Sequence, residues 1–196
     1  KKWLGVAGCL VLAGVVVWAV SVWGRSDPAT AVPSDSSGEP VVSLAEGLEV
    51  PWDLAFMPNG DIIVTERPGR IRLVDADEGL QSEPLLELPQ VVNRGEAGLL
   101  GIALQPESPD PPFLYVYYTY ESVDGTANRV SRFPFDRLER SSEEIVLDGI
   151  PGGRIHDGGR IRFGPDEMLY IPTGDAGTAS LAQERSSLAG KILRVT

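Results

Sequence analysis

A unit of strand, proline turn and strand occurs three times along the chain, and it constrains the fold more than any other feature. The three copies are DLAFMPNGDIIVTE, GIALQPESPDPPFLYVYYTY and RIRFGPDEMLYIPTGD. Their prolines, Pro58, Pro106 and Pro165, are separated by 48 and 59 residues. A period of roughly 40–50 residues made of strands alone is typical of propeller blades, each a four-stranded sheet. The spacing therefore predicts an all-β propeller and argues against a sandwich.

The first copy predicts a complete blade. Its four strands are expected at about residues 52–56, 61–65, 70–74 and 84–88, with tight turns at Asn59-Gly60 and Pro68-Gly69. From Val41 to Thr196 there is room for about three such units. Closed propellers usually carry 4–8 blades, so we expect this chain to be the N-terminal portion of a longer protein.

The N-terminus has a different character. Lys1 and Lys2 precede an uncharged, apolar run over residues 3–24, about the length that crosses a bilayer. This run is expected to be a membrane anchor or a cleaved signal peptide, and the two lysines place the following domain outside the cytoplasm. Residues 25–40, rich in Ser, Pro and Asp, are expected to be a disordered linker, and residues 41–196 a partial propeller domain.

Charge and cysteine content exclude some function classes. Without the two N-terminal lysines, 15 basic residues face 28 acidic ones, and this excess of negative charge argues against a nucleic-acid partner. Cys9 is the only cysteine and lies within the apolar run. No disulfide can therefore brace the domain, even in an oxidising compartment.

Four motifs resemble the glucose/sorbosone dehydrogenase family, soluble PQQ-dependent aldose sugar dehydrogenases. They are PWDLAFMPNGDIIVTERPGRIRLV, GEAGLLGIALQP, HDGGRIRFGPDEMLYIPTGDAG and SLAGKILRV, and the resemblance runs from about Leu44 to Thr196. It implies a six-bladed β-propeller that binds PQQ with calcium. It also implies a sugar substrate oxidised to a lactone and an external electron acceptor.

His156, the only histidine of the chain, lies between two pairs of glycines. The resemblance implies that it is the general base, and an unperturbed pKa of about 6.5 suits an imidazole to that task. Asp175 follows 19 residues later, a spacing that one hairpin could close, and the resemblance makes it the carboxylate that orients the ring. From the residues alone, His156 could be a loop histidine satisfied by the backbone, and Asp175 a turn residue that caps amides.

The resemblance implies that Glu96 and Asp157 are cofactor-binding residues. Glu96 stands where family members commonly have glutamine, and Asp157 where asparagine or glutamine often follows the histidine. Without the resemblance, Glu96 would be a solvated loop acid. These two substitutions motivate an alternative function, a membrane-tethered propeller that binds a partner without redox activity. A propeller lactonase is a third interpretation. It would need several carboxylates and histidines as metal ligands, and the chain has a single histidine. The sequence assigns no metal ligand.

Overall fold

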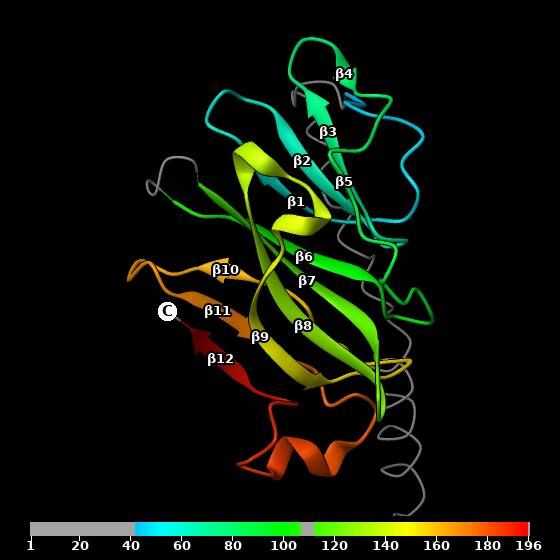
Figure 1. Ribbon diagram of the computed structural model, residues 1–196, viewed down its shortest axis with the longest axis vertical. Coiled ribbons are helices and arrows are strands. Elements are labelled where there is room, and N and C mark those ends of the chain that lie inside the picture. Colours follow the sequence, from blue (N-terminus) through cyan, green and yellow to red (C-terminus); the bar gives the residue numbers. More distant parts are fainter. Residues whose placement is uncertain (1–41, 107–111, 196) are drawn as a thin grey trace, which may run out of the picture. The chain divides into compact units, whose positions relative to one another are not determined.

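The computed structural model describes residues 42–106 and 112–195. The described chain folds into three antiparallel sheets that follow one another in sequence (Figure 1). The first sheet contains β1 (Pro51–Phe56), β2 (Ile62–Glu66), β3 (Arg70–Asp75), β4 (Gly79–Leu80) and β5 (Leu86–Glu87). The second contains β6 (Leu99–Leu104), β7 (Phe113–Ser122), β8 (Gly125–Pro134) and β9 (Glu144–Pro151). The third contains β10 (Arg162–Phe163), β11 (Leu169–Pro172) and β12 (Ile192–Val195).

Helix is confined to three short 3₁₀ turns in the described residues. They are η1 (Phe135–Arg137), η2 (Arg140–Ser142) and η3 (Ala179–Gln183). No helix within residues 42–106 and 112–195 is long and apolar enough to cross a membrane. The predicted anchor at residues 3–24 and the predicted linker at residues 25–40 lie outside the described residues.

Each copy of the sequence repeat forms the first hairpin of its sheet. The hairpins are β1–β2, β6–β7 and β10–β11. Pro58 and Pro165 lie in the turns of the first and third hairpins, and Pro106 follows the first strand of the second. Consecutive antiparallel sheets of this kind are what the propeller interpretation requires, whereas the number of blades in the complete protein stays a prediction.

The strand prediction for the first sheet is accurate to one residue for β1 to β3 and wrong for the fourth strand. Instead of a strand over residues 84–88, only Leu86–Glu87 pairs with β3, opposite Arg70 and Ile71. The other end of β3 pairs with β4, which the sequence analysis missed. Two short segments therefore share one strand of six residues, and Pro84, which lacks an N–H, cannot extend the ladder.

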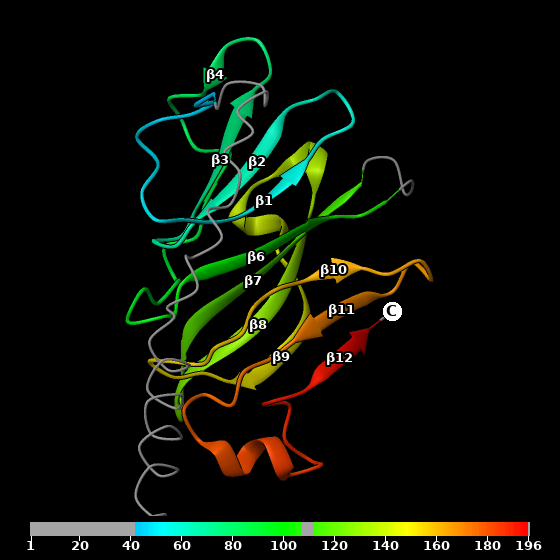
Figure 2. The same cartoon turned by 180° about the vertical axis from the view of Figure 1, so that it is seen from behind.

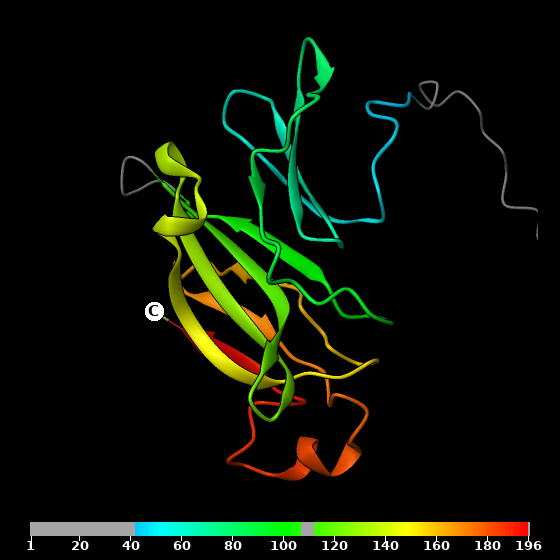
Figure 3. The ribbon, with the colours of Figure 1, turned by 45° about the vertical axis from the view of Figure 1, so that its right-hand side comes forward.

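The core lies between the sheets, and the second sheet packs on both of its faces (Figure 3). Leu114, Val116 and Tyr118 of β7 belong to the cluster shared with the first sheet. Tyr115 and Tyr117 alternate with them and belong to the cluster shared with the third sheet. The period of two explains why β7 is apolar at nearly every position, since a strand covered on both faces has no wet side.

Asp53 on β1 ties the first strands of the three sheets together. Its carboxylate, only 4% exposed, accepts a hydrogen bond from Arg160 at 2.9 Å and pairs with Arg162 at 3.3 Å. It also accepts the backbone N–H of Ile102 on β6 at 3.3 Å. Arg160 in turn lies over the ring of Trp52, 4.3 Å from its centroid. This cluster fixes where the third sheet begins, and therefore where the preceding loop lies.

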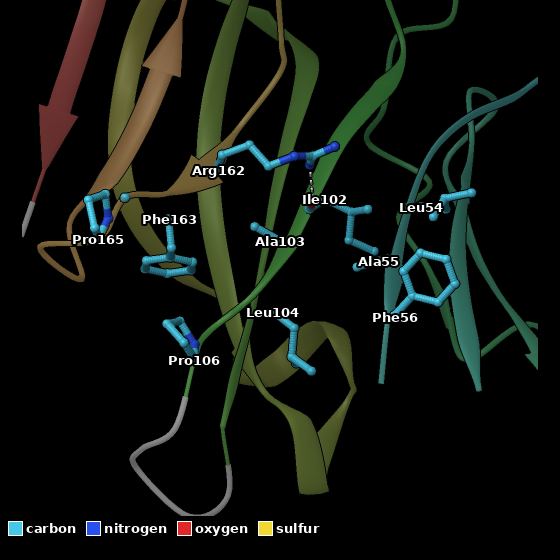
Figure 4. Close-up of a pocket in the computed structure, with 11 residues that line it drawn as sticks. Leu54, Ala55, Phe56, Ile102, Ala103, Leu104, Pro106, Arg162, Phe163 and Pro165 are labelled. Carbon is cyan, nitrogen blue, oxygen red and sulfur yellow. Dashed lines mark hydrogen bonds between the residues drawn. The ribbon is translucent and has the colours of Figure 1, made fainter. Parts of the chain in front are cut away.

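A hollow opens among the same three first strands, at their proline-turn end. Apolar residues of β1, β6 and β10 line most of it, including Phe56, Leu104 and Phe163, and Arg162 reaches across to the carbonyl of Ile102 (Figure 4). None of His156, Asp175, Glu96 or Asp157 lines this hollow. The candidate chemistry therefore lies elsewhere, among the connections at the other end of the sheets.

Candidate active site

His156 lies on the connection from β9 to β10, in a segment we call the His156 loop (residues 152–158). Its backbone is left-handed, with φ of 60°, a conformation that is uncommon outside glycine. The carbonyl of His156 accepts the N–H of Ala176 at 3.1 Å. A Cβ on Gly174 would lie 1.6 Å from that carbonyl oxygen, so only glycine fits between the loop and the end of β11. The imidazole itself is 57% exposed.

The structure brings His156 and Asp175 into hydrogen-bond contact, with 2.8 Å between Nδ1 and Oδ1. Asp175 follows β11, which runs from the Pro165 turn back to the end of the sheet that carries the His156 loop (Figure 2). Its Oδ1 also accepts the N–H of Gly177 at 2.9 Å. The carboxylate therefore has the turn-capping contact that spacing alone suggests and the contact with the histidine that the resemblance implies.

The pair shifts the pKa of both groups. The hydrogen bond to Asp175 raises the pKa of His156 above its ordinary value, and the same bond lowers the pKa of Asp175. In neutral His156, the proton on Nδ1 is donated to Asp175, which leaves the lone pair on Nε2. This arrangement presents a free proton acceptor on an exposed ring whose orientation is fixed from behind.

Glu96 reaches His156 from the connection between the first and second sheets. Its Oε2 accepts the backbone N–H of His156 at 2.6 Å, and its own N–H donates to the carbonyl of Arg154 at 2.9 Å. Arg67 supports this connection, because its guanidinium donates to Asn93 Oδ1 at 3.0 Å and to the carbonyls of Gly95 and Ala97. Glu96 is thus bound to the loop that carries the histidine.

Asp157 lies beneath the loop rather than on its surface, with an exposed fraction of 2%. Its Oδ1 accepts the N–H of Gly153 at 2.9 Å and the side-chain amide of Asn128 at 3.0 Å. Its Oδ2 is buried and has no hydrogen-bond partner among the described residues. Burial raises the pKa of this carboxyl. A contact between Asp157 and a cofactor stays a prediction, since its described contacts are with the protein.

The sequence analysis missed the residues that support the loop. Asn128 on β8 links Asp157 to Thr119 Oγ1, which donates to Asn128 Oδ1 at 2.6 Å. Tyr117 on β7 donates its buried hydroxyl to the backbone carbonyl of Asp157 at 2.9 Å. A signal for Asn128 does exist, because asparagine is depleted in strands and this one lies within β8. Nothing local marks Arg67 or Tyr117.

The residues present fit one side of a quinone site and supply no metal centre. An exposed imidazole with a free Nε2 and a bound Nδ1 fits the reacting side of a cofactor that takes hydride from an alcohol. In the described part of the chain, no three side chains of His, Cys, Asp or Glu converge to hold a metal ion. The described side chains therefore do not fit calcium by themselves.

Comparisons with known proteins agree with the resemblance. Aldose sugar dehydrogenase YliI of Escherichia coli is 32% identical over 159 residues, covering 78% of this chain and 43% of that protein. Quinoprotein glucose dehydrogenase B of Acinetobacter calcoaceticus is 29% identical over 150 residues, covering 71% of this chain and 31% of that protein. The PQQ-bound structure of aldose sugar dehydrogenase from Streptomyces coelicolor superimposes with a TM-score of 0.71 at 43% identity, covering 81% of this chain and 48% of that one.

The chain spans about half or less of the length of these relatives. The likeness nevertheless extends over nearly all of the described residues, in sequence and in fold. The family model of glucose/sorbosone dehydrogenase matches residues 48–196, and the chain belongs to this family of oxidoreductases.

Proposed function

We propose that the complete protein oxidises aldose sugars, or related alcohols, to lactones, with His156 as the general base. The observation that carries the proposal is the pair of His156 and Asp175, 2.8 Å apart, with Nε2 left free on an exposed ring. The PQQ-bound state of the Streptomyces coelicolor relative supports PQQ as the cofactor. The quinone, when bound, supplies a two-electron acceptor for the hydride on the anomeric carbon.

The chain's own residues account for the proton. Nε2 of His156 accepts the proton of the anomeric hydroxyl while the C–H bond of the same carbon breaks, so the carbon loses one hydride and the oxygen one proton. The ring becomes an imidazolium in this step. Asp175 holds the Nδ1 proton throughout and stabilises the new charge, because a carboxylate at 2.8 Å favours the protonated ring. Each turnover would also require an external acceptor for the two electrons.

The test uses the full-length protein, reconstituted with PQQ and calcium and assayed with an artificial dye as electron acceptor. His156→Ala should lower sugar oxidation by about 10²–10⁴-fold, because general-base catalysis contributes that much. A PQQ titration should give the same affinity for both proteins, since the role proposed for His156 is proton removal. Near-normal turnover in His156→Ala would eliminate the base assignment. Failure of the unmutated protein to bind PQQ would favour the alternative of a binding module.

We further propose that the domain lies outside the cytoplasm, anchored by or released from residues 1–24. The support is the apolar run behind Lys1 and Lys2. Protease added to intact cells should digest the domain together with a control protein exposed on the same side. Protection of the domain while that control is digested would show that the orientation is wrong.

A further inference from the structure

The backbone of His156 is held by contacts outside any strand. The residue lies on the connection between β9 and β10, with φ of 60°. Glu96 Oε2 accepts its N–H at 2.6 Å, from a residue 60 positions earlier in the chain. The carbonyl of His156 is held by Ala176 and the ring by Asp175. The histidine is thus bound at three points, and only Glu96 comes from another sheet's connection.

Glu96 is itself fixed in place. Its N–H donates to Arg154 O, two residues before His156. A Cβ on Gly95 would lie 2.1 Å from the same carbonyl oxygen, so the two connections are in direct backbone contact. Arg67 stabilises the same connection by donating hydrogen bonds to Asn93 Oδ1 and to the carbonyl of Ala97. Glu96 is exposed, but these contacts hold it against the His156 loop and indicate a positioning role.

We propose that Glu96 is a positioning residue, whose carboxylate holds the backbone of His156 in the left-handed conformation that presents Nε2 to the substrate. The consequence for catalysis rests on the function proposed above, whereas the contact itself does not. The residue acts through His156, so the role needs no contact between Glu96 and the cofactor. The role requires only an oxygen that accepts the N–H of His156, and both glutamate and glutamine side chains carry one.

The charge of Glu96 has a second effect that allows the contact to be measured. Three carboxylates raise the pKa of His156: the hydrogen bond of Asp175 is the main cause, and the charges of Glu96 and Asp157 add to it. Glu96→Gln removes one of these charges while retaining an acceptor for the N–H. Glu96→Ala removes both. The two variants therefore separate charge from position.

The first experiment is NMR on the 196-residue chain, kept in solution with a mild detergent and labelled with ¹⁵N-histidine. Because the chain has one histidine, its single imidazole and single histidine amide need no further assignment. In Glu96→Ala, the amide of His156 should exchange with solvent at least about tenfold faster, as expected for loss of a hydrogen bond to a charged group. In Glu96→Gln, exchange should stay near the unmutated rate, the Nδ1–H tautomer should persist, and the pKa of His156 should fall.

Glu83→Ala is the matched control, because Glu83 is an exposed glutamate on the connection before β5. It should change neither the exchange rate nor the pKa of His156. An unchanged amide exchange rate in Glu96→Ala, or an unchanged pKa in Glu96→Gln, would overturn the proposal. The glutamine variant keeps the test decisive even where the alanine variant does not fold.

The second experiment measures kcat and KM of the reconstituted full-length protein. Glu96→Ala should lower kcat by about tenfold, Glu96→Gln should restore most of it, and the PQQ affinity should be unchanged in both. A loss of PQQ affinity with kcat intact would show that Glu96 contacts the cofactor instead and would overturn the positioning role. Absence of sugar oxidation in the unmutated protein, with the NMR results as expected, would refute the proposed function alone.

Discussion

Two aspartates close to His156 lie in opposite surroundings. Asp157 is 2% exposed, beneath the loop, and burial raises its pKa. The side chain of Asp175 is 25% exposed, at the rim, and its bond to His156 lowers its pKa. One residue type therefore serves two purposes: the buried carboxylate accepts hydrogen bonds that shape the loop, and the exposed carboxylate orients the ring. The difference shows that the surroundings, rather than the residue type, decide which carboxylate contacts the ring of His156.

The largest expected effect on stability comes from the buried carboxylate. Asp157→Ala removes the acceptor of Gly153 N–H and one of the two acceptors of the Asn128 amide. Leaving partly buried donors unpaired should lower the free energy of unfolding by about 1–3 kcal/mol. Urea titration of the chain, followed by tryptophan fluorescence, measures this. An unchanged midpoint would contradict the anchoring role of Asp157.

Asp157→Asn is the conservative control and has its own pH signature. The amide oxygen can still accept from Gly153 and Asn128, so near neutral pH the asparagine variant should be at least as stable as the unmutated chain. Because the pKa of Asp157 is raised in the folded protein, the folded state binds a proton more tightly than the unfolded state. The stability of the unmutated chain should therefore fall as pH rises from the ordinary carboxyl pKa of 3.8 through the raised pKa of Asp157. The asparagine variant should lack that loss, and the two proteins should converge in acid.

The proline-turn end of the sheets and the end with the His156 loop differ in how far the sequence predicts them. At the proline-turn end, Pro58, Asn59 and Gly60 act locally, so the repeat locates β1 to β3 within one residue. The predicted strand at residues 84–88 contains β5 but is too long, and β4 was missed, because pairing with β3, rather than their own sequence, defines both strands. Turn residues can be recognised in a sequence because they act locally, whereas the pairing of distant strands cannot.

The site shows the same division. A hairpin spacing of 19 residues and the family resemblance together predicted the contact of His156 with Asp175. The bond from His156 N–H to Glu96 joins residues 60 positions apart. This bond depends on how the second and third sheets pack, which no local sequence pattern predicts. The burial of Asp157 could not be predicted either, because a charged residue beside glycines in a loop is expected to face solvent.

The smallest effect on stability, and the most informative one on chemistry, is expected at the rim. Asp175→Asn should leave the urea midpoint of the chain unchanged within measurement, because the side chain lies at the surface. Its effect belongs to the pH profile of the reconstituted full-length enzyme. His156 must be neutral to accept a proton, so activity rises as pH increases through the pKa of His156. Asp175 is the main cause of that raised pKa, so the asparagine variant should become active at lower pH. Its maximal rate should fall, because the imidazolium formed in the reaction has lost its carboxylate partner.

The matched control is Asp166→Asn, an exposed aspartate paired with Arg194 on the third sheet. It should move neither the acid limb of the pH profile nor the maximal rate. An acid limb that stays in place in Asp175→Asn would mean that Asp175 does not set the proton affinity of His156. The role that the comparison of the two aspartates gives to Asp175 would then be wrong.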